Sequence, residues 1–589
     1  MNNTSALANP NAAVQKRRWW ILAILSLSVF LVVVDNLIIN VAIPTLAREL
    51  EATTSGLQWI VDSYALVFAG LLLACGGLGD RFGRKIVMQI GMVLFGVFSA
   101  WAAFTDTTQQ LIIGRGLMGI GGALVFPSTL AILIDVFRDP VERAKSIGVW
   151  SAVSGAAVAF GPVTGGFLLE HFWWGSVFLI NVPIVAVALL LQAVFVPESK
   201  DPNAEQLDIA GFLLSIAFVS VLVYTIIEGP HRGWTSTESI AGFIGTVVLL
   251  TAFIWRERNT EHPLLDVRVF RDMRVTAATS SIFIAFFSLF GFTFLITQYF
   301  QFVRGYDPLE SGLRTLPFAF GAGITAPIAA QLSLKFGPKR VVPFGLLFMG
   351  VAQIWAGTFA VDSAYFGPVI ASMVLMACGL SLVTSPSSES VMGSLPRDMA
   401  GVGSAINDTS REVGGTLGVA IIGSVFASTY GPKIVDLLSS FALPEAAVSA
   451  AEESVGAAFA VSEQVGDQTL SNAIREVAGI SFLEGFQAAC TTVGMVAILG
   501  ALLALKRFGR ARQSAPVIQR RNRGASRQVR TPSTWCAEPP HWGSDQEAVW
   551  PCLPRSRRTP HQTRQHPRNR QRSPQGRRAG KRYRWAHEA

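Results

Sequence analysis

Apolar runs long enough to cross a membrane recur along the chain from Trp19 to Leu505. A helix needs about 20 predominantly apolar residues to span a bilayer, and its backbone groups must then bond within the helix. With 51% hydrophobic and only 15% charged residues, the 589-residue chain differs from an ordinary soluble protein. We therefore predict an all-α integral membrane protein with fourteen transmembrane helices, near residues 19–41, 59–79, 86–104, 111–134, 146–168, 175–196, 209–227, 239–255, 276–297, 311–333, 341–360, 365–389, 404–428 and 481–505.

Basic residues are shared unevenly between the two sets of predicted loops. The richer set contains Arg138, Arg143, Lys145, Arg256, Arg258, Arg268, Arg271, Arg274, Lys335, Lys339 and Arg340. Because loops rich in Lys and Arg stay in the cytoplasm, and an even number of spans returns the chain to its starting side, we expect both termini to be cytoplasmic. Lys16-Arg17-Arg18 precedes a full-length apolar run, which favours a retained anchor over a cleaved signal peptide.

The two ends differ from the apolar body. Residues 1–15 are polar and are expected to be disordered. Residues 506–589 hold 21 of the 48 Lys and Arg but four of the 39 acidic residues, so the remaining body has eight more acidic than basic residues. Lacking apolar periodicity, residues 506–589 are predicted to form a basic, disordered cytoplasmic tail. The alternatives are that the tail binds nucleic acid or anionic lipid and that it has no function. We expect that the chain has no nucleic-acid partner and that transport does not require the tail.

Two short motifs recur in the second half of the chain, and both recur after nearly the same number of residues. Phe82-Gly83-Arg84-Lys85 returns as Phe336-Gly337-Pro338-Lys339, and Gly161-Pro162-x-x-Gly165 is echoed by Gly414-Gly415-x-x-Gly418. Their matching places predict two six-helix bundles in parallel relation with two extra helices between them. The predicted domains are an N-terminal segment at 1–18, a bundle at 19–196, the extra helices and linkers at 197–275, a second bundle at 276–505 and the tail.

The segment between the last two predicted spans is long. It runs over about residues 430–480 and contains stretches rich in Ala and Glu. Such composition favours helix, so we predict an external helical hairpin, the alternative being an unstructured loop.

A short charged segment joins the second and third runs, with the sequence Gly76-Gly77-Leu78-Gly79-Asp80-Arg81-Phe82-Gly83-Arg84-Lys85. Its glycines allow a tight turn, and its basic residues place it in the cytoplasm. One interpretation is an ordinary positive-inside loop. The pattern also resembles the signature loop of the major facilitator superfamily. This resemblance implies a gating motif of Gly76, Asp80, Arg81, Gly83, Arg84 and Lys85, in which charge contacts of Asp80 and Arg81 hold one conformation closed.

Two carboxylates and an arginine lie inside predicted spans near the outer surface. Asp35 falls about 24 Å along the first helix from Trp19, at 1.5 Å per residue. Asp62 and Arg115 fall about one turn below that surface in the second and fourth spans. Charges in a span are costly unless they are paired or face water. We therefore expect Arg115 to pair with Asp35 or to modulate its pKa, with Asp62 nearby. The alternatives are that Asp35 only bridges helices and that Asp62 is interfacial.

The thirteenth span carries a second charged group. Asp408 and Glu412 share a helix face, and Arg411 can reach Asp408 one turn away. Glu412 lies about 12 Å into the membrane from the inside, deep enough to need partners. Because there are two acids and one arginine, one negative charge remains without a counter-charge. We expect proton coupling and recognition of a substrate cation to rest on these residues together with those of the outer group: Asp35, Asp62, Arg115, Asp408, Arg411 and Glu412.

The fifth span combines small residues with a proline: Gly148, Gly161, Pro162, Gly165 and Gly166. Small residues let helices pack closely, and a proline removes a backbone hydrogen bond and kinks the helix. A generic packing face would explain this pattern. The block also resembles the antiporter motif of the major facilitator superfamily, with Ala157 in place of one glycine.

Features over about residues 17–505 resemble the fourteen-helix drug:proton antiporters of that superfamily, in particular the QacA and SmvA type. The resemblance implies a major facilitator fold and proton-coupled multidrug efflux across a bacterial plasma membrane. The implied substrates are lipophilic cations such as quaternary ammonium biocides and dyes. The acidic body and the 39 Phe residues suit a cavity that binds cations. The alternatives are export of an endogenous metabolite or antibiotic and, less compatible with the fifth span, a channel or uptake facilitator.

Other chemistries lack support in the sequence. There is no Gly-x-x-x-x-Gly-Lys-Ser/Thr motif for nucleotide binding, and the five cysteines have no metal-ligand spacing. We therefore expect a secondary active transporter and not an enzyme, without cofactor or metal and driven by the proton gradient. Its expected partners are protons, small lipophilic cations and the lipid bilayer, and its expected state is a monomer.

Overall fold

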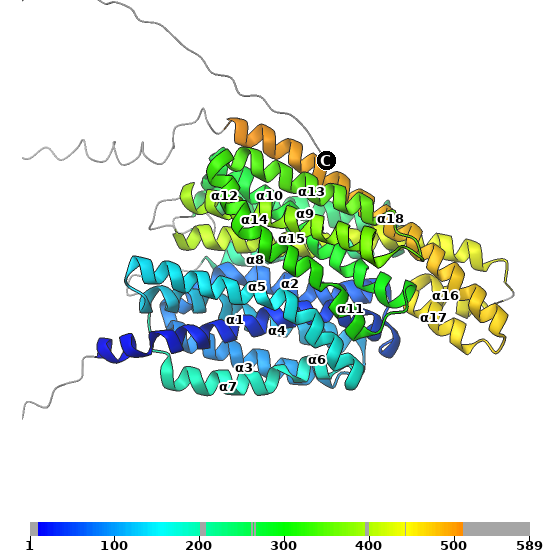
Figure 1. The fold of residues 1–589 in the computed structure, drawn as a ribbon, viewed down its shortest axis with the longest axis horizontal. Helices are drawn as coiled ribbons and strands as arrows, with labels where there is room; N and C mark the ends of the chain where they lie inside the picture. Colours follow the sequence, from blue (N-terminus) through cyan, green and yellow to red (C-terminus); the bar gives the residue numbers. More distant parts are fainter. Residues whose placement is uncertain are drawn as a thin grey trace, which may run out of the picture. The chain divides into compact units, whose positions relative to one another are not determined.

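A computed structural model describes residues 10–200, 208–260, 263, 267–394, 400–441 and 443–510. All of them belong to one compact unit, Met1–Asn522. Every regular element among these residues is a helix (Figure 1). The predicted tail lies outside the described residues from 511 onward.

The helices fall into a first group, a middle pair and a second group. The first group is α1 (Pro10–Glu49), α2 (Thr54–Phe82), α3 (Arg84–Ala103), α4 (Thr108–Val136), α5 (Pro140–His171), α6 (Ser176–Leu179) and α7 (Asn181–Phe195). The middle pair is α8 (Ile209–Arg232) and α9 (Thr237–Asn259). The second group comprises η1 (Val267–Arg271), α10 (Met273–Gln298), η2 (Tyr299–Val303), α11 (Pro308–Arg314), α12 (Leu316–Phe336), α13 (Pro338–Ala356), η3 (Tyr365–Val369), α14 (Ile370–Ser394), α15 (Ala400–Leu438), α16 (Glu445–Glu453), α17 (Val455–Gln464) and α18 (Gln468–Arg510).

Twelve of the described helical segments are long and apolar enough to cross a membrane. Helices α5 and α13 fall outside this set, although each occupies the place of a predicted span and packs against helices of the set. The all-α membrane architecture is thus confirmed, whereas the count of fourteen spans and the domain boundaries stay predictions. The expected disorder of residues 1–15 is wrong for its last six residues, because α1 begins at Pro10.

The two groups repeat one packing scheme. Helix α1 packs on α5 as α10 packs on α15, α2 on α4 as α12 on α14, and α3 on α7 as α13 on α18. Gly83 is the single residue between α2 and α3, and Gly337 is the single residue between α12 and α13. Their φ angles are +113° and +79°, which favour glycine because an L side chain rarely adopts them. The sequence repeat therefore marks structurally equivalent turns.

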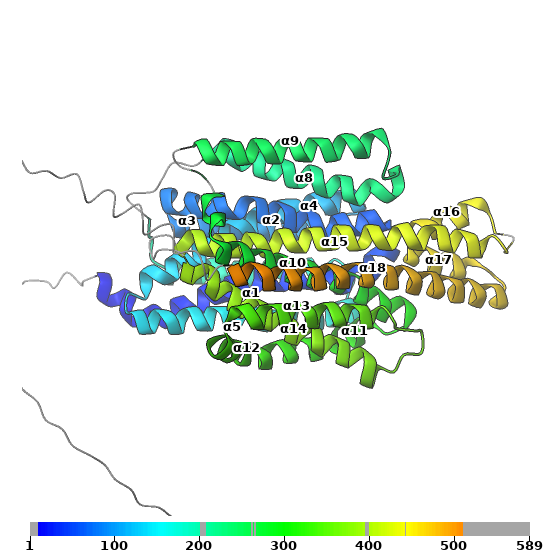
Figure 2. The same cartoon turned by 90° about the horizontal axis from the view of Figure 1, so that it is seen from above.

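The middle pair lies along one flank of the unit. Helix α8 packs against both α2 and α15, and α9 packs on its outer side (Figure 2). The Ser424 hydroxyl of α15 donates to the Ile226 carbonyl of α8 at 2.7 Å. The extra helices therefore cover the place where the two groups meet on this flank.

Helices α16 and α17 confirm the predicted helical hairpin between α15 and α18. The Tyr430 hydroxyl of α15 donates to the Ala451 carbonyl at 2.9 Å. The Thr54 hydroxyl of α2 donates to the Glu453 carbonyl, also at 2.9 Å. The hairpin thus contacts both groups at the side that we predict to be external.

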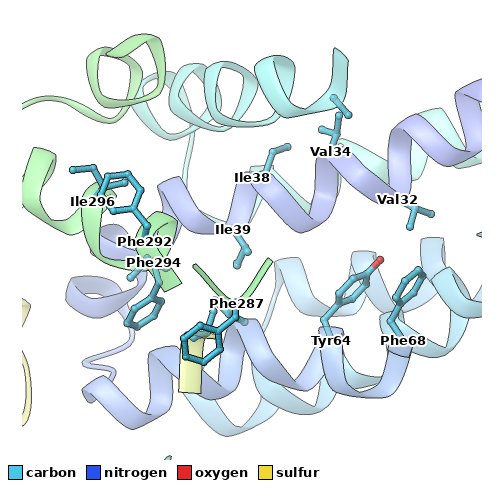
Figure 3. Close-up of a cluster of buried hydrophobic side chains, with 14 of the residues drawn as sticks. Val32, Val34, Ile38, Ile39, Tyr64, Phe68, Phe287, Phe292, Phe294 and Ile296 are labelled. Atoms are coloured by element: carbon cyan, nitrogen blue, oxygen red, sulfur yellow. The ribbon is translucent and has the colours of Figure 1, made fainter. Parts of the chain in front are cut away.

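An apolar cluster joins the two groups at the centre of the unit (Figure 3). Its labelled side chains come from α1, α2 and α10: Val32, Val34, Ile38, Ile39, Tyr64, Phe68, Phe287, Phe292, Phe294 and Ile296.

Candidate functional site: a buried ion pair beside an aromatic cavity

Asp35 on α1 and Arg115 on α4 form an ion pair inside the first group. Nη1 of Arg115 donates to Oδ2 of Asp35 at 2.7 Å, and both side chains are at most 1% exposed. The Asn181 side-chain amide of α7 donates to Oδ1 of Asp35 at 2.6 Å and to the Ser99 hydroxyl at 2.9 Å. The pairing expected from their depths is therefore present, and α3 and α7 complete its surroundings.

Arg115 has two further neighbours, both on α2. Its Nε donates to the Ile60 carbonyl at 3.2 Å. Its guanidinium carbon lies 4.3 Å from the centre of the Tyr64 ring, a distance at which cation–π attraction acts. Nη2 of Arg115 has no hydrogen-bond partner among the described residues. The arginine is thus held by one carboxylate, one carbonyl and one aromatic face.

Asp62, which we expect near Arg115 and Asp35, makes no hydrogen bond to either of them among the described residues. It is fully buried, and neither of its carboxylate oxygens has a hydrogen-bond partner among the described residues. One turn earlier on α2, the Gln58 amide donates to the carbonyls of Val419 and Ala420 at 3.3 and 2.9 Å. Since residues four apart share a helix face, Asp62 belongs to the face of α2 that packs on α15.

A cavity of about 310 Å³ lies where α1, α2, α4 and α5 meet α10, α12, α14 and α15. Its wall is mainly apolar and aromatic, with Tyr64, Phe68, Phe126, Trp150, Phe286, Phe290, Phe292 and Phe318. Its polar side chains include Asn36, Asn40, Asp408, Arg411 and Glu412. The charged cluster of α15 therefore faces the cavity directly, whereas Asp35 and Arg115 lie behind the wall that Tyr64 contributes to.

The three charged residues that α15 places in the cavity wall differ in their partners. Arg411 lies 3.7 Å from Asp408 and 4.6 Å from the centre of the Phe286 ring. Asp408 also accepts a hydrogen bond from the Asn407 amide at 3.1 Å. Oε2 of Glu412, in contrast, is buried without a hydrogen-bond partner among the described residues. Glu412 is thus the α15 carboxylate with the most capacity left for a ligand.

The charged loop between α2 and α3 is held by Arg84. Its Nε donates to Asp80 at 2.7 Å, and Nη1 contacts the Asp135 carboxylate of α4. Lys85 donates from Nζ to the Ala193 carbonyl of α7 at 3.0 Å. Arg81, expected to share a gate with Asp80, is exposed and lies over the neighbouring Phe82 ring. The structure therefore places Arg84, and not Arg81, on Asp80.

Gly161, Pro162, Gly165 and Gly166 of α5 lie in close contact with other helices. A Cβ added at Gly161 would lie 2.7 Å from Cβ of Leu37, and one at Gly166 would lie 2.5 Å from the Pro308 carbonyl oxygen. Gly165 packs on Ile38 of α1, and the carbonyl of Pro162 packs against Gly312 of α11.

Gly148 departs from this pattern. It is exposed, and a Cβ added there would meet nothing within 4 Å. The expected close packing thus holds for the Gly161–Gly166 block and not for Gly148.

Three contacts of this site have no counterpart in the sequence-based prediction. Asn181 binds Asp35, Tyr64 lies on Arg115, and Gln58 bonds to α15. Asn181 and Gln58 are amides in otherwise apolar runs, which is a detectable signal, because such groups need partners in a membrane. Tyr64 carries no such signal, since a tyrosine near a membrane surface is common. Among the described residues there is no group of three or more His, Cys, Asp or Glu that could hold a metal ion.

Comparison with known proteins assigns the family. Residues 25–419 match the family model of the Major Facilitator Superfamily. The chain belongs to this superfamily. It is accordingly a membrane transporter and not an enzyme.

The chain is 35% identical to the multidrug efflux pump LfrA of Mycolicibacterium smegmatis, over 76% of this chain and 87% of that protein. It is 32% identical to the methyl viologen resistance protein SmvA of Salmonella typhimurium, over 82% of this chain and 97% of SmvA. It is 31% identical to the tetracenomycin C resistance and export protein of Streptomyces glaucescens, over 84% of this chain and 93% of that protein.

Solved structures agree on the fold. A bacterial homolog of the human lysosomal transporter Spinster, in an inward-facing and unoccupied conformation, is similar with a TM-score of 0.59 at 15% identity. The match covers 84% of this chain and 98% of that one. At this identity the likeness concerns the fold alone.

Proposed function

We propose that this transporter exports lipophilic organic cations in exchange for protons, as a member of the fourteen-helix drug:proton antiporters in a bacterial plasma membrane with both termini in the cytoplasm. The observation that carries the proposal is the cavity wall: an aromatic surface that includes the carboxylate of Glu412, one oxygen of which has no hydrogen-bond partner among the described residues. Aromatic faces and a buried carboxylate oxygen without a hydrogen-bond donor are the groups that attract a desolvated organic cation. The relatives named for multidrug efflux and for methyl viologen resistance support the same substrate class.

The proton would bind at Asp35. Its carboxylate is buried, lies close to the cavity wall through Arg115 and Tyr64, and has a basic partner that stabilises its ionised form. Protons and cations then alternate, because a cation in the cavity favours the ionised carboxylate and a proton on Asp35 disfavours the cation. The two groups of helices would rock about the cavity to expose it to each side in turn. No cofactor is needed, since the proton gradient supplies the energy.

A second candidate is export of an antibiotic or endogenous metabolite that is anionic or neutral. Arg411 in the cavity wall and the relative named for tetracenomycin C resistance and export favour it. The two candidates differ in which α15 residue the substrate needs, Glu412 for a cation and Arg411 for an anion.

The test is efflux of ethidium from preloaded, energised cells of an efflux-deficient host. Cells with the chain should lose the dye faster than cells with the empty vector, and a protonophore should abolish the difference. Ethidium efflux that persists after collapse of the proton gradient would contradict proton coupling. Faster accumulation of the dye would contradict export itself.

A further inference from the structure

The Arg115 guanidinium has partners of two different kinds. Asp35 provides a negative charge at 2.7 Å, whereas Tyr64 provides the face of an aromatic ring at 4.3 Å. Arg115 is 0% exposed, so water cannot replace either partner. A buried guanidinium that loses its carboxylate partner is strongly destabilised.

Proton uptake at Asp35, which the proposed function requires, creates this situation. Arginine keeps its charge at any pH relevant to a protein, so Arg115 stays cationic when Asp35 becomes neutral. Asn181 does not offset the loss, because its amide donates hydrogen bonds and carries no charge. Two partners of Arg115 are unchanged by proton uptake at Asp35, the Ile60 carbonyl and the Tyr64 ring. The negative face of the ring attracts the guanidinium and repels a carboxylate charge, so its net stabilisation is greater when Asp35 is neutral.

We propose that Tyr64 is a positioning residue that holds Arg115 while Asp35 is protonated, and thereby allows Asp35 to accept a proton at working pH. This role rests on the proposed proton-coupled export and goes beyond it, by naming the residue that couples the cavity wall to the ion pair.

The Tyr64 ring is fixed for this task by its surroundings. It stacks on Phe68 with ring centres 5.8 Å apart and planes 9° apart. On α4, Gly119 and Gly122 leave the space that the ring needs: a Cβ at Gly122 would lie 2.9 Å from the Tyr64 hydroxyl oxygen. A Cβ at Gly119 would lie 2.7 Å from the Tyr64 carbonyl oxygen. Helix α4 therefore supplies both the guanidinium and the glycines that let the ring approach it.

The other charged groups around Tyr64 and Asp35 come from few elements. From α15, Glu412 acts electrostatically on Tyr64, and Asp408 and Arg411 share the cavity wall with it. From α2 itself, Asp62 makes no hydrogen bond to Arg115. From α5, the contacts on α1 near Asp35 are made by Gly161 and Gly165, which carry no charge. Among the described residues, Arg115 is the charged group that acts on Asp35.

The direction of the effect follows. Without the aromatic face, the state with a neutral Asp35 and an Arg115 without its counter-charge loses more stabilisation than the ionised pair does, so Asp35 holds its proton less tightly. The midpoint pH of the proton release that accompanies cation binding should then fall by about one unit. This shift equals about a tenfold loss of proton affinity at Asp35.

The experiment uses the full chain in lipid nanodiscs and ethidium as the probe. Ethidium binding is followed by fluorescence, and proton release by a pH dye in weakly buffered solution, between about pH 5 and 9. Tyr64→Leu should still bind ethidium but release protons with a midpoint about one unit lower than wild type. Tyr64→Phe keeps the ring face and should restore the wild-type midpoint.

Phe318→Leu is the matched control, because it removes a cavity-wall ring of α12 that makes no ring contact with Tyr64 or Arg115 among the described residues. It should change ethidium affinity without moving the midpoint. If Tyr64→Leu does not fold, Tyr64→Met replaces it with the same expectation. A wild-type midpoint in the Leu or Met variant overturns the role of Tyr64 while leaving antiport intact. Absence of proton release from wild type instead overturns the proposed function, and this inference with it.

Discussion

The Gln58 side chain of α2 reaches across to α15 and donates to the main-chain carbonyl of Ala420 at 2.9 Å. Opposite it, Gly423 leaves the necessary room, since an added Cβ would lie 2.5 Å from Cδ of Gln58. Near the same end of the unit, Gln301 donates to the Val41 carbonyl at 2.9 Å. These bonds link the first and second groups near the side predicted to be external, so the structure is closed there.

Gln58→Leu should loosen this closure. Side-chain hydrogen bonds between membrane helices contribute on the order of 0.6 to 1.7 kcal/mol each, and Gln58 makes two. We therefore expect the outside-open state to gain between about eightfold and a few hundredfold in population relative to the closed state, for a total of roughly 1.2 to 3.4 kcal/mol. The measurement is external labelling of Asn40→Cys, a cavity residue, by an impermeant maleimide in a chain without its five native cysteines.

Gln353→Leu is the matched control for this change. Gln353 makes the same kind of bond, donating to the Ser288 carbonyl at 2.9 Å, but within the second group. Its loss should lower thermal stability without raising the labelling rate. Equal acceleration by both variants would mean that Gln58 only supports general packing.

The glycines of α5 should separate by their contacts. Gly166→Ala pushes a methyl group against the backbone of Pro308 and Leu309, between the two groups of helices. We expect a loss of about 1 to 3 kcal/mol in thermal stability of the closed state, as for other overpacked interiors, together with reduced efflux. Gly148→Ala meets nothing within 4 Å and should match wild type in both assays. Similar defects in both variants would show that the motif acts through something other than the packing seen here.

Asp208, which caps α8 just before its span, should make stability depend on pH. Burial would raise the pKa of its carboxyl, but hydrogen bonds from Arg256 and from the Gly211 amide outweigh burial and lower that pKa. A carboxyl with a lowered folded-state pKa stabilises the fold above its unfolded value of about 3.9, and this contribution disappears as the pH falls through the folded value. Asp208→Asn should thus melt earlier at pH 6 and change less between pH 6 and pH 3 than wild type.

The exposed acid Glu238, paired with Arg232, provides the comparison for Asp208. Surface ion pairs contribute little, so Glu238→Gln should reproduce the wild-type melting curve across the same pH range. If wild type and Asp208→Asn lost stability equally between pH 6 and pH 3, this loss could not be assigned to Asp208.

How far the sequence predicts this structure depends on the kind of signal each residue carries. Gly83 and Gly337 mark equivalent turns because glycine is favoured where φ is positive, and local chemistry of this kind is readable from sequence. The Asp35–Arg115 pair follows from depth, since two buried charges at one level must compensate each other.

Rotation about the helix axis was not predictable in the same way. Asp62 makes no bond to Arg115, and Gln58, one turn before it on α2, bonds to α15, because α2 packs against both α4 and α15. The position of α8 against both groups and the contact of Tyr64 with Arg115 likewise depend on long-range packing that no local pattern encodes.

Glu412→Gln should affect substrates according to their charge. Because the cavity wall is aromatic and Glu412 retains an oxygen without a hydrogen-bond partner in the described part of the chain, a cation loses a counter-charge in this variant, whereas a neutral dye loses little. We expect about a tenfold weaker binding of ethidium, near the lower end of the range for one contact with a charged group, and unchanged binding of Nile red. Asp408→Asn is the control, since Asp408 is already occupied by Arg411 and Asn407. Equal losses for both dyes would remove Glu412 from cation recognition.

Asp35→Asn should separate the two possible roles of the buried pair. The amide keeps the size of the carboxyl but leaves Arg115 without its counter-charge, so we expect a loss of about 3 to 5 kcal/mol in stability together with a loss of proton-coupled efflux. Asp35→Glu should retain part of the coupling, because the carboxylate survives at a shifted position.

The double variant Asp35→Asn with Arg115→Met decides between bridge and proton carrier. Replacing a whole buried ion pair with uncharged groups is often close to neutral in stability, so the melting temperature should recover toward wild type. If Asp35 carries the proton, ethidium-driven proton release in everted vesicles must stay absent in this stable protein. If release returns with stability, Asp35 is a structural bridge. The proton must then bind at another buried acid, and Asp62 is the first to test, because its carboxylate lacks a partner among the described residues.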